Sequence, residues 1–263
     1  MLFSVLPANR FFMGRLNWHH RLATLLGYDM ARFEKQITMH SHLRAQIALL
    51  EIDVVLDVGA NVGQHAMLLR DLGYRGRIVS FAPASNAFAK LREAAAADPL
   101  WQVHNLALSD QAGEATMDIS GTDVFSSLHP HSAYGKVRYG RHIEVVRNET
   151  IRTERLDTFL ASELPEFDTH RVFLKMDTQG HDMRVFAGAG TYQGRFKGLQ
   201  SELSVKPLYE GVPDYLEALL CYQQAGYKPT GIYANHRDHE TGQIIELDCI
   251  LAAVDIAEPA PRR

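Results

Sequence analysis

The sequence predicts an α/β protein organised around an open, mainly parallel β-sheet, and three observations support this. A buried strand at 54–58 runs into a glycine-spaced turn and then into a helix-like segment at 64–72. Further apolar, strand-like runs alternate with helix-like segments along the middle of the chain. Two strand-like runs, 227–233 and 244–253, end the pattern and are close enough to pair antiparallel. This alternation is typical of a parallel sheet with helices packed on its faces.

Composition and charge narrow the class of protein. The chain has 263 residues, enough for one large α/β domain, and a formal net charge of −4. That charge disfavours a general nucleic-acid binder, which needs a clustered basic face. Cys221 and Cys249 lie in apolar surroundings without metal-ligand spacing, and no apolar run approaches the roughly 20 residues of a transmembrane helix. We therefore expect a cytoplasmic protein with reduced cysteines, no transmembrane segment and no nucleic-acid partner.

Residues 1–45 differ from the rest of the chain. Apolar residues recur there at helical intervals, with arginines between them: Phe11, Phe12, Leu16, Trp18, Leu22, Leu25 and Leu26. We interpret the segment as a helical cap packed on the domain edge, or on a second copy in a homodimer. A lid over the site and contact with an anionic membrane surface are the alternatives. Residues 46–256 would then form the α/β domain, and 257–263 a flexible tail.

The remaining elements follow in order along the chain. Strands are expected at 77–81, 101–108, 115–119, 172–177 and 199–205, and helices at 42–50, 87–97, 157–164, 181–186 and 214–225. Gly73 and Gly226 mark the ends of two helices, because glycine adopts the left-handed conformation that often ends a helix. Residues 120–145 look like a long loop, and runs at 143–146 and 150–156 are compatible with an extra hairpin.

The turn after the first strand points to a cofactor. Its pattern is Asp57-x-Gly59-x-Asn61-x-Gly63, not the Gly-x-Gly-x-x-Gly of dinucleotide-binding turns. Glycines let the backbone approach a ligand closely, and the N-terminus of the next helix favours polar or anionic groups. The spacing favours S-adenosylmethionine (SAM) over NAD, and the absence of an acidic residue after the second strand also disfavours an NAD-dependent oxidoreductase. A glycine-rich turn without any cofactor is the alternative.

Several short segments with distinctive residues occur in a fixed order. They are LDVGANVG at 56–63, IVSF at 78–81 with Pro83, ALS at 107–109, SSL at 126–128, RLD at 155–157, LKMDTQG at 174–180, ELS at 202–204, PLYEG at 207–211, and TG at 241–242 with Asp248. Together they resemble the FkbM-type SAM-dependent methyltransferases, over about residues 52–253. The resemblance implies a Rossmann-like class I methyltransferase fold, with a seven-stranded, mainly parallel sheet and an antiparallel C-terminal hairpin strand. It also implies methyl transfer to a hydroxyl, commonly on a sugar or natural product.

The resemblance also assigns a cofactor site. The methionine part of SAM would lie against Asp57, Gly59, Ala60, Asn61 and Gly63, with Asp177 nearby. The ribose would lie against Phe81, Ala82 and Pro83. The adenine would lie against Asn105, Ala107 and Leu108. A plain strand end is the alternative for 105–109.

Position 82 departs from the family pattern. Proteins of this type usually carry an acidic residue there, whose carboxylate accepts hydrogen bonds from the ribose hydroxyls, whereas this chain has Ala82. A hydrogen bond to a charged group contributes roughly 1.5–3 kcal/mol. Its loss is expected to weaken SAM binding by about tenfold or more, unless Ser85 or Asn86 substitutes for it in part.

Polar residues near the ends of two later strands are the candidates for the chemistry. Methyl transfer is an in-line displacement, so the site must align the acceptor oxygen with the methyl group and remove its proton. The candidate catalytic residues are Lys175, Asp177, Gln179, Asp182 and Glu202. Lys175 has a structural alternative, an ion pair with Asp177 or Glu202, and His181 is expected to be exposed at a helix start. Asp177 and Glu202 are also a candidate Mg²⁺ site, which would lower the pKa of the acceptor hydroxyl.

The expected acceptor is a small molecule or glycan with a free hydroxyl. Ser127, Tyr134, Tyr139 and Tyr209 are the candidate substrate-binding residues. The sequence therefore predicts a SAM-dependent O-methyltransferase that modifies a sugar, glycolipid or secondary metabolite. The alternative is a catalytically weakened or non-catalytic SAM-fold protein used for binding or interaction, with Ala82 marking its altered cofactor site.

Overall fold

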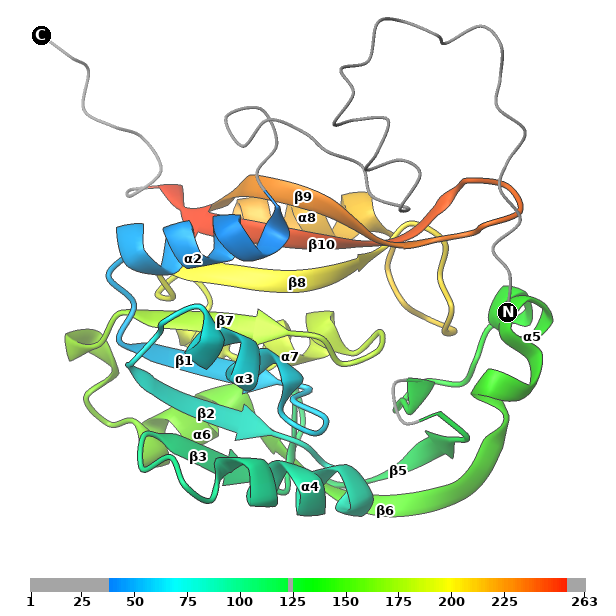
Figure 1. The fold of residues 1–263 in the computed structure, drawn as a ribbon, viewed down its shortest axis with the longest axis horizontal. Helices are drawn as coiled ribbons and strands as arrows, with labels where there is room; N and C mark the ends of the chain where they lie inside the picture. The colour runs from blue at the N-terminus through cyan, green and yellow to red at the C-terminus, as the bar shows by residue number, and fades with distance from the viewer. Residues whose placement is uncertain (1–37, 123–124, 255–263) are drawn as a thin grey trace, which may run out of the picture. The chain divides into compact units, whose positions relative to one another are not determined.

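The computed structural model describes residues 38–122 and 125–254, and its main feature is a seven-stranded sheet (Figure 1). The strand order is β3-β2-β1-β7-β8-β10-β9. Its strands are β1 (Val54–Val58), β2 (Arg77–Phe81), β3 (Trp101–His104), β7 (Val172–Met176), β8 (Gly198–Ser204), β9 (Tyr227–Arg237) and β10 (Ile244–Ala253). Neighbouring strands are parallel, except that β10 is antiparallel to both β8 and β9. The predicted fold class is confirmed, including the antiparallel strand near the C-terminus.

The central strand β1 explains why the sequence pattern was clear. All five of its residues are buried, because helices cover both faces of the sheet. Side chains alternate between the faces. Val54, Leu56 and Val58 belong to the apolar cluster on one face, and Val55 belongs to the cluster on the other. A parallel strand that is buried on both sides reads as an almost continuous apolar run, and Asp57 is the one interruption.

Helices supply the apolar residues that pack on each face of the sheet. One cluster contains residues of α2 (Met39–Leu49), α3 (Gln64–Asp71) and α4 (Ser85–Ala95), and the other contains residues of α6 (Leu156–Glu163), α7 (Asp182–Gly188) and α8 (Tyr215–Gln224). Helix α2 crosses the predicted domain boundary at residue 45. The rest of the predicted cap, with its dimer contact, and the predicted tail at 257–263 lie outside the described residues. Within 38–122 and 125–254, no helix has both the length and the apolar character that crossing a membrane requires.

A second sheet corrects the expectations for the middle of the chain. It has three strands in the order β4-β6-β5, namely β4 (Ala107–Ser109), β5 (Gly113–Ser120) and β6 (Val145–Arg155). The strand expected at 101–108 is wrong, because the chain leaves the large sheet after His104 and enters the small one at Ala107. The hairpin expected within 143–156 is also wrong. These residues form one strand, because they pair with β5 and not with each other.

The segment expected as a loop at 120–145 contains more regular structure than its composition indicates. Helix α5 (Ala133–Tyr139) begins after Ser132, whose hydroxyl accepts a hydrogen bond from Gly135 N. A 3₁₀ turn at Gly140–Ile143 follows, and two further 3₁₀ turns lie at Phe167–Thr169 and Gly190–Tyr192.

Helix α8 has the most complete N-terminal cap among the described helices, and it provides a test of local stability. The Asp214 carboxylate accepts hydrogen bonds from Leu216 N and Glu217 N, and the Glu217 carboxylate accepts one from Asp214 N. We expect Asp214→Ala to lower the free energy of unfolding by about 1 kcal/mol, because two helix N–H groups lose their partner. Urea unfolding measures this, with exposed Asp71→Ala as the control.

Candidate active site

The carboxyl ends of β1 and β7 meet where the order of strands along the chain reverses. Ligands of open α/β sheets bind in the crevice at such a switch point. Backbone hydrogen bonds join the segments that follow the strands there. Ala60 N donates to Phe81 O at 2.9 Å, and Asp177 N donates to Val58 O at 3.1 Å. The turns after β1, β2 and β7 therefore lie side by side.

The glycine turn after β1 has a backbone that few residues other than glycine adopt. Gly59, Asn61 and Gly63 have φ values of +78°, +49° and +97°. A Cβ on Gly59 would lie 1.9 Å from the Asp177 carbonyl oxygen, so glycine is required for the turn to pack against the end of β7. Asn61 Oδ1 is buried without a hydrogen-bond partner in the described structure. It is therefore available to a ligand in the crevice.

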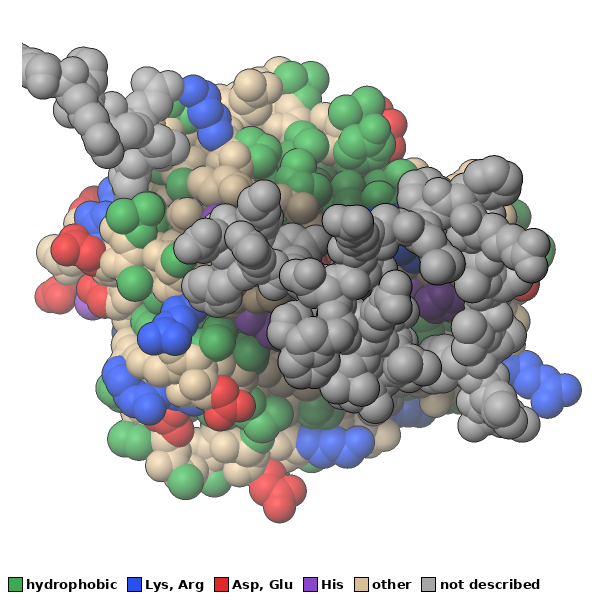
Figure 2. All heavy atoms as spheres, turned by 45° about the horizontal axis from the view of Figure 1, so that its top comes forward, with side chains coloured by type: hydrophobic (Ala, Val, Ile, Leu, Met, Phe, Trp, Pro, Cys, Tyr) green, Lys and Arg blue, Asp and Glu red, His purple; other side chains and the backbone are tan. Residues whose placement is uncertain are grey.

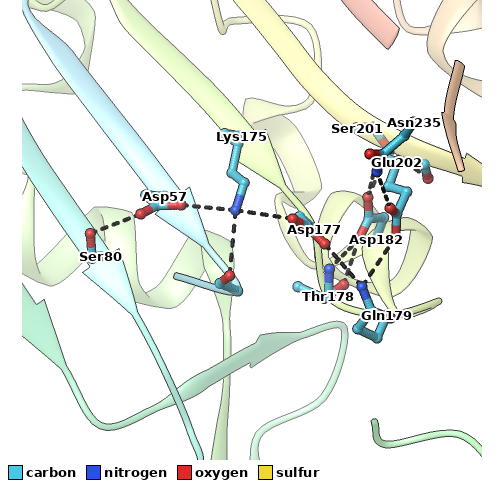
Figure 3. A network of polar contacts seen from close by, with 11 residues as sticks. Asp57, Ser80, Lys175, Asp177, Thr178, Gln179, Asp182, Ser201, Glu202 and Asn235 are labelled. Carbon is cyan, nitrogen blue, oxygen red and sulfur yellow. Dashed lines mark hydrogen bonds and ion pairs between the residues drawn. The ribbon is translucent and has the colours of Figure 1, made fainter. Parts of the chain in front are cut away.

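A buried ion pair joins β1 to β7 beneath this turn (Figure 3). Lys175 Nζ lies 3.0 Å from Asp57 Oδ1 and 3.7 Å from Asp177 Oδ2. Asp57 is fully buried and also accepts a hydrogen bond from Ser80 Oγ. Burial alone would raise the pKa of Asp57, but the Lys175 ammonium and other contacts outweigh this and lower it. The ion-pair alternative for Lys175 thus has Asp57 as its nearer partner, not Glu202.

Asp182 anchors the turn that follows β7. Its Oδ1 accepts hydrogen bonds from Thr178 N and Thr178 Oγ1, at 2.8 and 2.6 Å. Its Oδ2 accepts from Ser201 Oγ at 2.8 Å and from Glu202 N at 3.1 Å. Both oxygens are therefore occupied, and the carboxylate joins this turn to β8 (Figure 3). Its contacts are those of a residue that positions the turn.

Gln179 is held on several sides at the tip of the same turn. Its backbone carbonyl accepts a hydrogen bond from Ser127 Oγ, and its Oε1 accepts one from Tyr209 OH, both at 2.7 Å. Its Nε2 donates toward Asp177 Oδ1 at 3.2 Å and Glu202 Oε2 at 3.3 Å. These contacts support a left-handed φ of +52° at Gln179. Ser127 and Tyr209, both expected to bind substrate, form hydrogen bonds with Gln179, and their role toward a substrate stays a prediction.

The Gln179 side-chain amide also contacts both residues of the predicted Mg²⁺ site, Asp177 and Glu202. A cation shared by the two carboxylates would need the position that the uncharged Gln179 NH₂ group occupies between them. The other oxygen of Glu202 accepts a hydrogen bond from Asn235 Nδ2 at 2.8 Å. In the part of the chain that the structure describes, no group of three or more His, Cys, Asp or Glu residues could hold a metal ion. These residues do not fit Mg²⁺, and we assign the metal no role.

A cavity of about 370 Å³ extends along this edge of the sheet. This is large enough for a ligand of the size of a small cofactor. Apolar residues from several elements line one part, among them Phe81, Leu106, Leu108, Met117 and Ile119. Polar residues line another, among them Lys175, Asp177, Gln179, Gln200, Asn235 and Asp248. The cavity therefore has both an apolar and a polar wall.

Only some of the predicted site residues reach this cavity. Those that line it are Gly59, Ala60, Asn61, Phe81, Ala82, Pro83, Ala107, Leu108, Lys175, Asp177 and Gln179. Those that do not line it are Asp57, Gly63, Asn105, Ser127, Tyr134, Tyr139, Asp182, Glu202 and Tyr209. Tyr134 and Tyr139 bind Asp238 and His236 near the tip of the β9–β10 hairpin.

Polar residues that the sequence did not identify as site residues also line the cavity, among them Gln200, Asn235 and Asp248. They belong to β8, β9 and β10, so the topology of the sheet brings them together. Burial, followed by the nearby Asp177, raises the pKa of Asp248 to about 6. A charged residue within the apolar run at 244–253 was the signal that could have identified Asp248.

His181 is not the exposed residue that the sequence predicted. Its side chain lines the cavity, with Nε2 3.0 Å from Ser109 Oγ and Nδ1 2.9 Å from His129 Nε2. Burial, followed by the neighbouring His129, lowers the pKa of His181 to about 4. The imidazole is therefore neutral at physiological pH.

The strand order, with a cavity at the switch point, is that of the Rossmann-like class I methyltransferase fold that the resemblance implied. Residues 57–229 match the family described as Methyltransferase FkbM domain. The chain therefore belongs to the FkbM methyltransferase family, as the ordered segments predicted, and it is a methyltransferase.

Proteins similar to this chain include two curated relatives and a solved structure. The 2-O-methyltransferase NoeI of Sinorhizobium fredii is 26% identical over 207 residues, covering 72% of this chain and 81% of the relative. The 31-O-demethyl-FK506 methyltransferase FkbM of Streptomyces tacrolimicus is 31% identical over 182 residues, covering 59% of this chain and 66% of the relative. The solved structure is an O-methyltransferase of Bacillus cereus in complex with S-adenosylhomocysteine (SAH). It is 10% identical to this chain, the match covers 88% of this chain and 87% of the other, and the TM-score is 0.45.

Proposed function

We propose that this chain transfers the methyl group of SAM to a hydroxyl of a neutral sugar, glycolipid or secondary metabolite. The observation that carries this proposal is the cavity shared by the glycine turn after β1, the polar turn after β7 and polar residues of β8, β9 and β10. The names of both relatives describe methyl transfer to an oxygen. Figure 2 shows acidic and basic side chains interspersed over the described part of this face.

The described residues fit SAM on two grounds. The orphaned Asn61 Oδ1 is an acceptor for a polar hydrogen, and the Gly59–Ala60 backbone lies at the cavity wall without a side chain that would obstruct a ligand. The apolar wall around Leu106 and Leu108 suits a flat heterocycle. When bound, SAM supplies an activated methyl group, and the residues at the polar wall must bind and deprotonate the acceptor.

Asp248 is the carboxylate that we assign to the acceptor proton. Glu202 has both oxygens engaged by Gln179 and Asn235, and burial raises its pKa well above the usual range. Asp177 forms an ion pair with Lys175. Asp248 lines the cavity and has a pKa of about 6, so it is ionised at neutral pH and basic enough to take a proton.

Methyl transfer from radiolabelled SAM to a panel of alkyl glycosides, free sugars and polyols tests the proposal. NMR of the product locates the new methyl group, and we expect it on an oxygen. A matched panel of amines and thiols is the control. Tight SAH binding with no transfer to any hydroxyl compound would contradict the proposal. It would favour the binding-protein alternative.

The role of Asp248 predicts a pH profile for the acceptor identified in that panel. We expect kcat to fall about tenfold per pH unit below pH 6 and to level off above it, because protonation removes the base. Asp248→Asn should lower kcat by roughly 10²- to 10⁴-fold and abolish this dependence. Exposed Asp71→Asn is the matched control. A variant at position 248 that keeps the rate and profile of the unchanged protein would exclude Asp248 as the base.

A further inference from the structure

The missing carboxylate at position 82 leaves the expected ribose site without its usual partner. The Ala82 side chain is 1% exposed and offers only a methyl group. Asn105 does not line the cavity, and its Nδ2 donates to Ala82 O at 2.9 Å and Pro83 O at 2.8 Å. Its amide thus fixes the backbone at the end of β2. Another element must supply the polar contact.

Strand β6 brings two charged residues to this place. Glu149 Oε1 accepts a hydrogen bond from Ser85 N at 2.8 Å, at the start of α4 and three residues after Ala82. Glu149 Oε2 accepts one from Arg147 Nη1 at 3.0 Å. Because both contacts use the same carboxylate, the Arg147 guanidinium lies beside the segment 82–86.

The cavity lining agrees with this placement. Arg147 lines the cavity together with Ala82, Pro83 and Asn86, whereas Glu149 does not line it. Both terminal nitrogens of Arg147 face the same Glu149 oxygen, with Nη1 at 3.0 Å and Nη2 at 2.9 Å from Oε2, and the Arg147 side chain is 36% exposed. A guanidinium carries five N–H donors, and one carboxylate oxygen cannot accept hydrogen bonds from all of them. Arg147 therefore has an unused donor at the wall of the cavity.

We propose that Arg147, oriented by Glu149, binds the ribose hydroxyls of SAM in place of the acidic residue that is absent at position 82. The proposal rests on the proposed function, because it takes SAM to be the ligand. The polarity of the contact is reversed: a carboxylate would accept hydrogen bonds from the hydroxyls, whereas a guanidinium donates hydrogen bonds to their oxygens. The charge remains balanced, because Glu149 neutralises Arg147 whether or not the neutral ribose is bound.

Calorimetric titration with SAH tests the proposal without any acceptor. We expect Arg147→Gln to weaken SAH binding by about tenfold or more, since a hydrogen bond from a charged group is lost. Arg152→Gln is the matched control. Arg152 lies on the same strand and forms the same kind of ion pair, with Glu154 at 2.7 Å, but it does not line the cavity. We expect this control to leave the affinity unchanged, and urea unfolding without ligand verifies that both variants are folded.

A second ligand assigns the contact to the ribose. The 2′-deoxy analogue of SAH should bind the unchanged protein more weakly than SAH does, and this difference should shrink in Arg147→Gln. An equal loss for both ligands, or unchanged SAH affinity in a folded Arg147→Gln variant, would overturn the proposal. Failure of the unchanged protein to bind SAH would be a different result, and it would instead contradict SAM as the cofactor.

Discussion

Replacing Gly59 by alanine is expected to destabilise the whole domain by about 2–5 kcal/mol and to abolish SAH binding. Two costs add. A left-handed φ of +78° costs roughly 1–2 kcal/mol for a residue with a Cβ. The new methyl group would also lie 1.9 Å from Asp177 O, and overpacking of this kind costs roughly 1–3 kcal/mol. To relieve this clash, the turn after β1 must move away from β7, and that movement displaces the cavity wall.

Gly73→Ala separates the two costs. Gly73 has a φ of +95°, but no atom lies within 4 Å of the Cβ that alanine would introduce. It should therefore show only the conformational cost, about 1–2 kcal/mol in urea unfolding, with SAH affinity retained. If Gly59→Ala loses no more stability than Gly73→Ala, the contact with Asp177 does not restrict the turn.

Gly59 also illustrates how much of the fold the sequence predicts. Strand β1 is buried on both faces, so its run is apolar except for Asp57, and the glycines after it indicate a turn with a left-handed backbone. Local patterns of this kind located the strands of the large sheet, and the ordered segments identified the family. The small sheet was not predicted. Its strands β5 and β6 depend on their pairing with each other, which no local pattern shows.

The candidate site was less predictable, because it depends on which side chains meet across the fold. Ser127 and Tyr209 have the residue types of a sugar site, but both hydroxyls donate hydrogen bonds to Gln179. His181 has the sequence context of an exposed helix start, yet Ser109 and His129 enclose it. Asp248 reaches the cavity because β10 pairs with β8 in a register that places it opposite Glu202. Strand register between distant segments is not visible in one sequence.

Replacing Lys175 by methionine is expected to cost about 3–5 kcal/mol of stability, because the change leaves the Asp57 carboxylate charged, fully buried and without its cation. Urea unfolding at pH 7 measures this, and exposed Lys136→Met is the control, expected to lie within about 0.5 kcal/mol of the unchanged protein. The double variant Asp57→Asn with Lys175→Met should recover much of the loss. Replacing both charges removes the desolvation cost that breaking the pair exposes.

The pH dependence of this variant gives an independent measure of the same ion pair. In the unchanged protein the pKa of Asp57 is lowered, so the stabilisation from the pair is present at neutral pH and is lost as the pH falls through that lowered value. Without Lys175, burial dominates and raises the pKa of Asp57, so acidification neutralises the stranded carboxylate and stabilises the variant relative to pH 7. The stability gap between the two proteins should therefore narrow from pH 7 to pH 5. A gap of the same size at pH 7 and pH 5, or one below about 1 kcal/mol at pH 7, would show that Lys175 does not offset the free-energy cost of burying the Asp57 carboxylate.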